Sequence, residues 1–255
     1  MKRLFALLLI TLVLGNSSNM SQAQADPIRD GQALAEELRS LQMGIPGSIK
    51  ATMKIRKRDG SRIEHRVNKH TQTFENGWRD IFQVDKSSSD ASEWLWIDHR
   101  IDASPDYKLA ISKELPTDID AFTTLDSERA MTPLGESDFW VADLGLDFLH
   151  WPDQRTFTSK ITRRKGVGCK LLESSRPTRS PEGYYKVRSW ISTEHLGVVY
   201  AEAFDIHERK IKTFEVNGIE KINGHHHLKE LRIRNMRDKS TSVLEFDYSG
   251  IQTTP

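Results

Sequence analysis

Near its C-terminus the sequence reads TSVLEFDY over Thr241–Tyr248, where apolar residues alternate with Glu245 and Asp247. The run LKELRIR over Leu228–Arg234 alternates in the same way. A period of two is typical of a strand in a sheet that has one covered face and one face in water. The two runs therefore predict an antiparallel sheet, and another part of the chain must cover its apolar face.

Six strands of this kind follow one another between Val167 and Tyr248, separated by short stretches of turn-forming residues. Those gaps are too short for crossover helices, so we expect neighbouring strands to pair antiparallel as a meander. The predicted strands are Gly168–Ser174, Tyr184–Ser192, Val198–Asp205, Lys210–Gly218, His227–Asn235 and Thr241–Tyr248.

A β-hairpin is predicted in the N-terminal half. Ser48–Arg58 and Ser61–Lys69 both alternate, and Asp59-Gly60 between them is a strong hairpin signal. Because this alternation matches that of the meander and no linker intervenes, we expect one continuous sheet. The outer face of the hairpin is favoured as a solvated face, with phosphate binding as the alternative. It carries Lys54, Arg56, Arg58, Arg62, Glu64 and Arg66.

Further strands are predicted at Gln72–Val84, Glu93–Asp98 and Tyr107–Ser112. In the second of these, Trp94 and Trp96 share one face and apolar residues occupy the other. A strand that is apolar on both faces is buried on both faces. This pattern indicates an interior larger than a one-sided sheet needs.

Helical segments are the expected cover of the sheet. A helix over Gln32–Leu41, capped by Asp30, has a leucine stripe. Residues 136–151 predict one or two short helices, interrupted by Gly145 and ended by Pro152. We expect this apolar segment to lie over the concave face and to line a ligand groove. The predicted lining residues are Phe139, Trp140, Phe148 and Trp151, with Trp94 and Trp96 opposite them.

The first 25 residues predict a signal peptide, with Lys2 and Arg3 before an apolar run and cleavage after Ala25. Residues 26–255 are expected to form a single exported, periplasmic domain. Removing Lys2 and Arg3 from the 37 basic residues leaves 35, against 36 acidic residues. This balance does not favour nucleic-acid binding, which needs a basic surface.

The candidate chemical groups favour a protein that is not an enzyme and has neither cofactor nor metal. In His225-His226-His227 only alternate side chains share a strand face, so we favour an exposed turn over a metal site. Cys169 is interpreted as a small buried apolar residue. Asp143 and Asp147, four residues apart, are interpreted as a solvated helix face. No phosphate-binding loop or G-x-S-x-G motif occurs in the sequence.

Several weak motifs in a fixed order resemble the outer-membrane lipoprotein-sorting (LolA-like) family, in its poorly characterised broader branch. They are Thr52–Ser61, Leu144–Phe148 with Asp153, Cys169–Ser174, and the terminal block with Met236 and Ser240–Ser242. The resemblance covers most of residues 48–248. It implies an α+β, mainly β fold: an unclosed β-barrel of strongly curved antiparallel sheet, with short helices covering the concave face.

The same resemblance implies a periplasmic protein that binds a lipid or a lipoprotein acyl chain in an apolar groove. Its expected partners are an envelope transporter or an outer-membrane acceptor. The alternative is a non-enzymatic interaction module that assists an envelope transport complex, with its cavity filled by its own side chains. Lipid that co-purifies with the protein would distinguish the carrier from the module.

Overall fold

A computed structural model describes residues 26–41, 46–86, 88–157, 161–177, 183–222 and 225–251. The predicted signal peptide, residues 1–25, and Asn223-Gly224, where a reversal is predicted, lie outside these residues. Among the helices that are described, none has the length and apolar character needed to span a bilayer.

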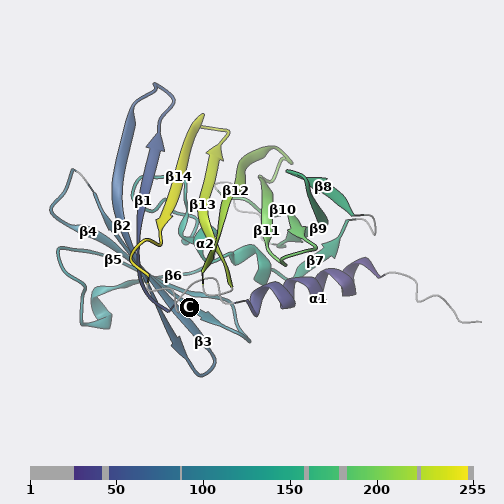
Figure 1. Ribbon diagram of the computed structural model, residues 1–255, viewed down its shortest axis with the longest axis horizontal. Helices are drawn as coiled ribbons and strands as arrows, with labels where there is room; N and C mark the ends of the chain where they lie inside the picture. The colour runs from purple at the N-terminus through teal and green to yellow at the C-terminus, as the bar shows by residue number, and fades with distance from the viewer. Residues whose placement is uncertain are drawn as a thin grey trace, which may run out of the picture.

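One antiparallel sheet of fourteen strands dominates the structure (Figure 1). Its order is β6-β5-β4-β3-β2-β1-β14-β13-β12-β11-β10-β9-β7, with β8 paired to β9. No pairing between the described strands joins β6 to β7, so the curved sheet stays open, and the predicted unclosed barrel is confirmed. The strands are β1 Gly47–Arg56, β2 Arg62–Phe74, β3 Gly77–Asp85, β4 Ser92–Arg100, β5 Asp106–Ser112, β6 Thr123–Leu125, β7 Asp153–Thr156, β8 Thr162–Arg164, β9 Val167–Ser175, β10 Lys186–Ser192, β11 Val198–Phe204, β12 Lys210–Ile222, β13 His225–Asn235 and β14 Ser240–Asp247.

The first and the last strand of the sequence pair in the middle of this sheet. β1 pairs antiparallel with β14, from Lys50 opposite Asp247 to Arg56 opposite Thr241. In this register Met53 lies beside Leu244, and both are fully buried. The expectation of one continuous sheet for the hairpin and the meander is confirmed.

The predicted single strand Gln72–Val84 is wrong. β2 ends at Phe74 and β3 begins at Gly77, so the chain reverses at this point. The apolar pattern continues through the reversal, which hid the Asn76-Gly77 turn signal. Glycine is required at position 77 because an added Cβ would lie 1.9 Å from the carbonyl oxygen of His99.

The first helix, α1 (Pro27–Arg39), begins five residues before the predicted start. Asp26, rather than Asp30, caps it and accepts hydrogen bonds from the backbone N–H groups of Ile28 and Arg29. A capping aspartate directly before proline is a typical helix start, because proline lacks the N–H that a helix leaves unpaired. Leu34 and Leu38 of the predicted stripe are buried, but its third member, Leu41, is exposed because the helix ends at Arg39.

Short helices lie in the chain between β5 and β7. The 3₁₀ helix η1 (Ile119–Ala121) precedes β6, and α2 (Val141–Leu144) and the 3₁₀ helix η2 (Asp147–His150) follow it. Buried side chains of α2 and η2 belong to the same apolar core as the inner face of the sheet. The predicted short helices against the concave face are confirmed.

Gly31→Ala tests the docking of α1 against β7. A Cβ at position 31 would lie 2.4 Å from the Cα atom of Arg155, so the helix or the strand must move. We expect a loss of about 1 to 3 kcal/mol in the free energy of unfolding, although alanine is the better helix former. Gln32→Ala, at an exposed position of the same helix, is the control. Urea unfolding measures both variants, and equal stability would contradict the close packing.

Candidate functional site

Residues 126–151, here called the covering segment, fill the concave side of the sheet. Phe139 and Phe148 are almost completely buried, Trp151 is buried, and Trp140 packs against the same core. Other buried apolar residues of the segment are Ala130, Leu134, Val141, Ala142 and Leu149. The structure therefore brings together four of the six residues predicted to line a groove.

Trp94 and Trp96 do not join them. Their neighbours Leu95 and Ile97 point into the main core, whereas the two tryptophans belong to a second cluster on the opposite face of β4. Phe122, in the chain that follows β5, packs on Trp96 with ring centroids 4.3 Å apart. The expected position of the two tryptophans opposite the covering segment is wrong, because a returning loop buries the outer face of this strand.

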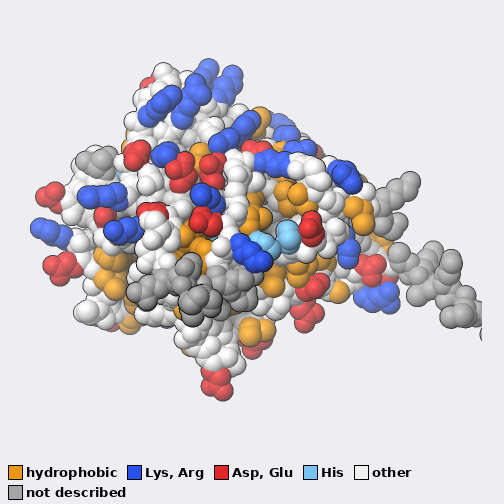
Figure 2. All heavy atoms as spheres, viewed as in Figure 1, with side chains coloured by type: hydrophobic (Ala, Val, Ile, Leu, Met, Phe, Trp, Pro, Cys, Tyr) orange, Lys and Arg blue, Asp and Glu red, His pale blue; other side chains and the backbone are white. Residues whose placement is uncertain are grey.

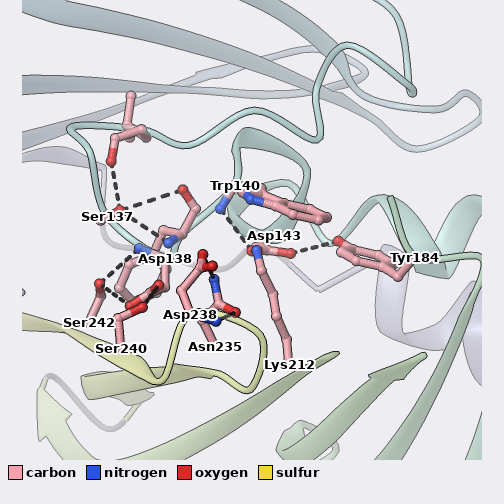
Figure 3. A network of polar contacts seen from close by, with 12 residues as sticks. Ser137, Asp138, Trp140, Asp143, Tyr184, Lys212, Asn235, Asp238, Ser240 and Ser242 are labelled. Carbon is pink, nitrogen blue, oxygen red and sulfur yellow. Dashed lines mark hydrogen bonds and ion pairs between the residues drawn. The ribbon is translucent and has the colours of Figure 1, made fainter. Parts of the chain in front are cut away.

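Asp143, at the end of the first turn of α2, is the centre of a buried polar network (Figure 3). The hydroxyl of Tyr184 donates to Oδ1 of Asp143 over 2.6 Å. The backbone N–H of Trp140 and Nζ of Lys212 both donate to Oδ2, over 2.8 and 3.0 Å. These bonds tie the covering segment to β12 and to Tyr184, just before β10.

Aromatic rings enclose the same network. The ring of Trp140 stacks on Tyr184, with centroids 5.2 Å apart and planes 2° apart. Lys212 Nζ lies 3.4 Å from the centroid of the Trp140 ring. A charged amine over an indole face is stabilised by the quadrupole of the ring. Lys212 is thus held by one carboxylate and one aromatic face.

Burial governs protonation in this network. Loss of water around Lys212 lowers the pKa of its amine to about 8, although Asp143 opposes that shift. Burial and the carboxylate of Asp143 raise the pKa of Tyr184 well above its usual range. At neutral pH the lysine carries a proton and the tyrosine is a hydrogen-bond donor.

A second anchor joins the covering segment to β14 (Figure 3). The hydroxyls of Ser240 and Ser242 donate to the two carboxylate oxygens of buried Asp138. The backbone N–H of Asp138 in turn donates to Oγ of Ser242 over 2.8 Å. A third anchor comes from β4, where Glu93 accepts a hydrogen bond from the backbone N–H of Gly135 over 2.7 Å.

The sequence indicated that Asp143 and Asp147 form a solvated helix face. This interpretation is wrong, because both side chains are buried. Leu146 has a left-handed backbone with φ 51°, so the two aspartates belong to two separate short helices. Asp147 accepts hydrogen bonds from the Ser127 hydroxyl and from the indole N–H of Trp151. Burial raises its pKa above the usual range, against these two hydrogen bonds.

An open cleft of about 890 Å³ lies beside these anchors. Trp140 and Lys212 form its inner wall, and the tips of the β1–β2 and β13–β14 hairpins form its rim. Charged side chains of both signs line it: Lys57, Arg58, Asp59, Glu136, Asp138, Lys212, Arg237 and Asp238. The cleft is therefore lined largely by charged groups, and it meets the apolar core only at Trp140 and Ile211.

The remaining candidate groups do not converge. Cys169 is a free, buried thiol, and burial raises its pKa. His226 packs on His195, and His227 packs on Tyr248. Among the residues described, no group of three or more His, Cys, Asp or Glu side chains is placed to hold a metal ion.

The sequence reasoning missed Lys212, Asp138, Tyr184 and the two serines as anchors. One signal was available for Lys212, because it lies two residues before Phe214 and strand alternation places both on the core face. A lysine on that face needs a partner. The identity of that partner, Asp143, depends on folding and not on any local pattern.

Lys212→Met tests the buried pair. Removal of the Lys212 amine leaves Asp143 buried without an ion pair. We therefore expect a loss of about 3 to 5 kcal/mol in the free energy of unfolding at pH 7. Lys210 lies on the same strand as Lys212 and pairs near the surface with Glu202 of β11. Lys210→Met should cost less than about 1 kcal/mol in the free energy of unfolding. Urea unfolding followed by tryptophan fluorescence measures both. Equal losses would mean that the buried pair has no special role.

The same pair predicts a pH dependence. The pKa of Lys212 is about 8 when folded, below its ordinary value of 10.5, so the unfolded chain binds more protons between these values. The contribution of Lys212 to the free energy of unfolding should therefore rise as the pH rises through this window and be lost as the pH falls below it. Lys212→Met should lack this increment, and a parallel pH dependence in both proteins would contradict the assignment.

Comparisons with known proteins agree with this architecture. A family model described as "Uncharacterized protein" matches residues 116–254, more than half of the chain. A solved DUF1329 family protein from Desulfovibrio piger has a TM-score of 0.69 at 17% identity, covering 89% of this chain and 96% of its own. No curated protein matches the sequence.

Two further solved structures are similar to this chain. A putative outer membrane lipoprotein-sorting protein domain from Vibrio parahaemolyticus has a TM-score of 0.66 at 16% identity, covering 88% of this chain and 94% of its own. A LolA superfamily protein from Nitrosomonas europaea has a TM-score of 0.58 at 16% identity, covering 88% and 92%. Identities this low show the shared fold alone. The chain therefore belongs to the family whose model covers residues 116–254, and its fold is that of a poorly characterised LolA-like branch.

Proposed function

We propose that the protein is a periplasmic carrier that binds a lipid or the acyl chain of a lipoprotein between the sheet and the covering segment. One observation supports this most directly. The segment presents apolar side chains to the sheet and is fixed by local polar anchors, among them those at Asp138, Asp143 and Gly135. Breaking these anchors would expose an apolar surface without unpairing a strand.

The energetics of an acyl chain fit such a surface. Burial contributes about 0.8 kcal/mol per CH₂ group, so a chain of about sixteen carbons contributes roughly 12 kcal/mol before the costs of association. Binding then needs no dedicated polar group in the interior. Phe139, Phe148 and Trp151 would contact the chain from the segment, and Leu95 and Ile97 would contact it from the sheet.

The LolA-like fold also supports a binding protein rather than an enzyme. A solved structure with this fold is described as an outer membrane lipoprotein-sorting protein domain. Transfer of acylated cargo requires no bond to be made or broken. The predicted signal peptide supports a place outside the cytoplasm. We propose an envelope transporter or an outer-membrane acceptor as the donor or receiver of the cargo.

A second candidate is a non-enzymatic interaction module of an envelope transport complex. The side chains of the covering segment already complete a close-packed core against the sheet, which favours this alternative. Native mass spectrometry after gentle purification separates the two, because a carrier should retain lipid and a module should not.

A reversible lock tests the carrier directly. Asp138→Cys and Ser242→Cys, with Cys169→Ala, place two thiols where the side chains of residues 138 and 242 now touch. Oxidation should fix the covering segment to β14 and weaken binding of a fluorescent fatty acid by about tenfold or more, a loss of roughly 1.4 kcal/mol. Reduction of the same sample should restore binding.

The controls separate gating from damage. Asp138→Cys alone, treated with the same oxidant, cannot form the bond and should bind the fatty acid as its reduced form does. Intact mass confirms the disulfide in the double variant. If the locked and reduced proteins bind the probe equally, the segment is not the entrance. If the wild-type protein neither binds the probe nor carries lipid, the module remains and the carrier is rejected.

A further inference from the structure

Five basic side chains at one end of the sheet form what we call the basic patch: Arg56, Arg58, Arg62, Arg234 and Lys239. All five are exposed. Nearby Lys54 and Arg232 are paired with Glu245 and Glu230, whereas no ion pair among the described residues includes a member of the patch. Within the described residues the fold therefore gives no member of the patch an ion pair, although the charge of Arg234 still acts on the carboxylate of Glu215.

The strand register gathers these charges into a row. Arg56 on β1 lies directly opposite Arg62 on β2. On the other side of Arg56, Thr241 separates it from Arg234 on β13. Like charges directly opposite each other destabilise a sheet. The opposed arginines lower the stability of the protein when it is alone. A partner that neutralises their charge would remove this cost.

Composition does not account for this concentration of charge. The whole chain has 37 basic and 36 acidic residues, so an even distribution would leave no basic end. Figure 2 shows Lys and Arg side chains gathered at the top of the view, over the tips of the β1–β2 and β13–β14 hairpins. The polar cleft opens at the same end, with Arg58 common to the patch and the cleft.

We propose that the basic patch docks the protein onto an anionic membrane surface, with lipid phosphates against the arginine side chains. Arginine pairs with phosphate through two parallel hydrogen bonds, and four of the five residues are arginines. Protein interfaces are also enriched in arginine, but they add aromatic anchors, and the patch contains none. The exposed large apolar side chain beside the patch is Met236, in the β13–β14 turn, which can enter the lipid headgroup layer. This docking does not depend on acyl-chain carriage.

Vesicle binding tests the proposal. The purified protein should co-sediment with phosphatidylcholine vesicles that contain phosphatidylglycerol, and not with phosphatidylcholine alone. Binding should fall steeply toward about 0.5 M NaCl, because the Debye length shrinks well below 10 Å. Each cation near an anionic surface strengthens binding by roughly fivefold, so replacing Arg56, Arg58, Arg62 and Arg234 by glutamine should weaken binding by at least about a hundredfold.

A matched variant controls for net charge. Lys113, Arg163, Lys170 and Lys221 are exposed cations elsewhere on the chain, and their replacement by glutamine removes the same total charge. This variant should still bind the anionic vesicles. The proposal is overturned if both quadruple variants lose binding equally, if the patch variant binds as the wild type does, or if the wild type ignores anionic vesicles. Circular dichroism confirms that each variant is folded.

The opposed arginines give a second, independent readout. Arg62→Thr removes the like-charge pair with Arg56, so it should raise the melting temperature by about 1 to 3 °C while it weakens vesicle binding. Arg66→Thr, on the same face of the same strand but between Thr52 and Asp85, removes no like-charge pair and should not raise the melting temperature. A variant at position 62 that loses stability along with binding would show that Arg62 serves the fold instead of a membrane.

Discussion

Pairing of β1 with β14 is the constraint on which the rest of the structure depends. It joins two halves of the chain that would otherwise end in unpaired edges, one running from β1 to β6 and the other from β7 to β14. Edges of that length would invite pairing with other chains. The same pairing places Ser240 and Ser242 beneath Asp138 and sets Arg56 beside Arg234 across one strand. The anchors and the basic patch are therefore products of one register.

Apolar packing and polar anchoring have different roles over the concave face. Apolar contacts supply most of the stabilisation but have no direction, so alone they would leave the position of the covering segment poorly defined. Asp138, Asp143 and Glu93 fix it through hydrogen bonds of defined geometry. A buried ion pair such as Asp143–Lys212 loses solvation when it forms, which offsets much of its contribution to stability. Its main effect is to fix the position of the covering segment.

Local pattern was sufficient for most of the sheet. All six meander strands lie within a few residues of their predicted bounds, because each buries one face and alternates accordingly. Pattern failed where it was ambiguous or not local. Alternation continued across Asn76-Gly77 and hid a turn. The i, i+4 spacing of Asp143 and Asp147 suggested a shared helix face, but Leu146 places them in two separate short helices. The partner of Asp143 lies 69 residues away on β12, so no window of sequence could supply it.

The covering segment begins after β6 and ends before β7, and these are the two free edges of the sheet. Because it is tethered at both ends, it cannot leave the molecule, and it can only loop outward. It therefore stays at a high effective concentration over the concave face, set by the length of chain between its two ends. Any molecule that binds in its place must displace the covering segment, and the effective concentration of the segment does not change when the protein is diluted. The affinity of that face for any guest is thus set as much by the segment as by the sheet.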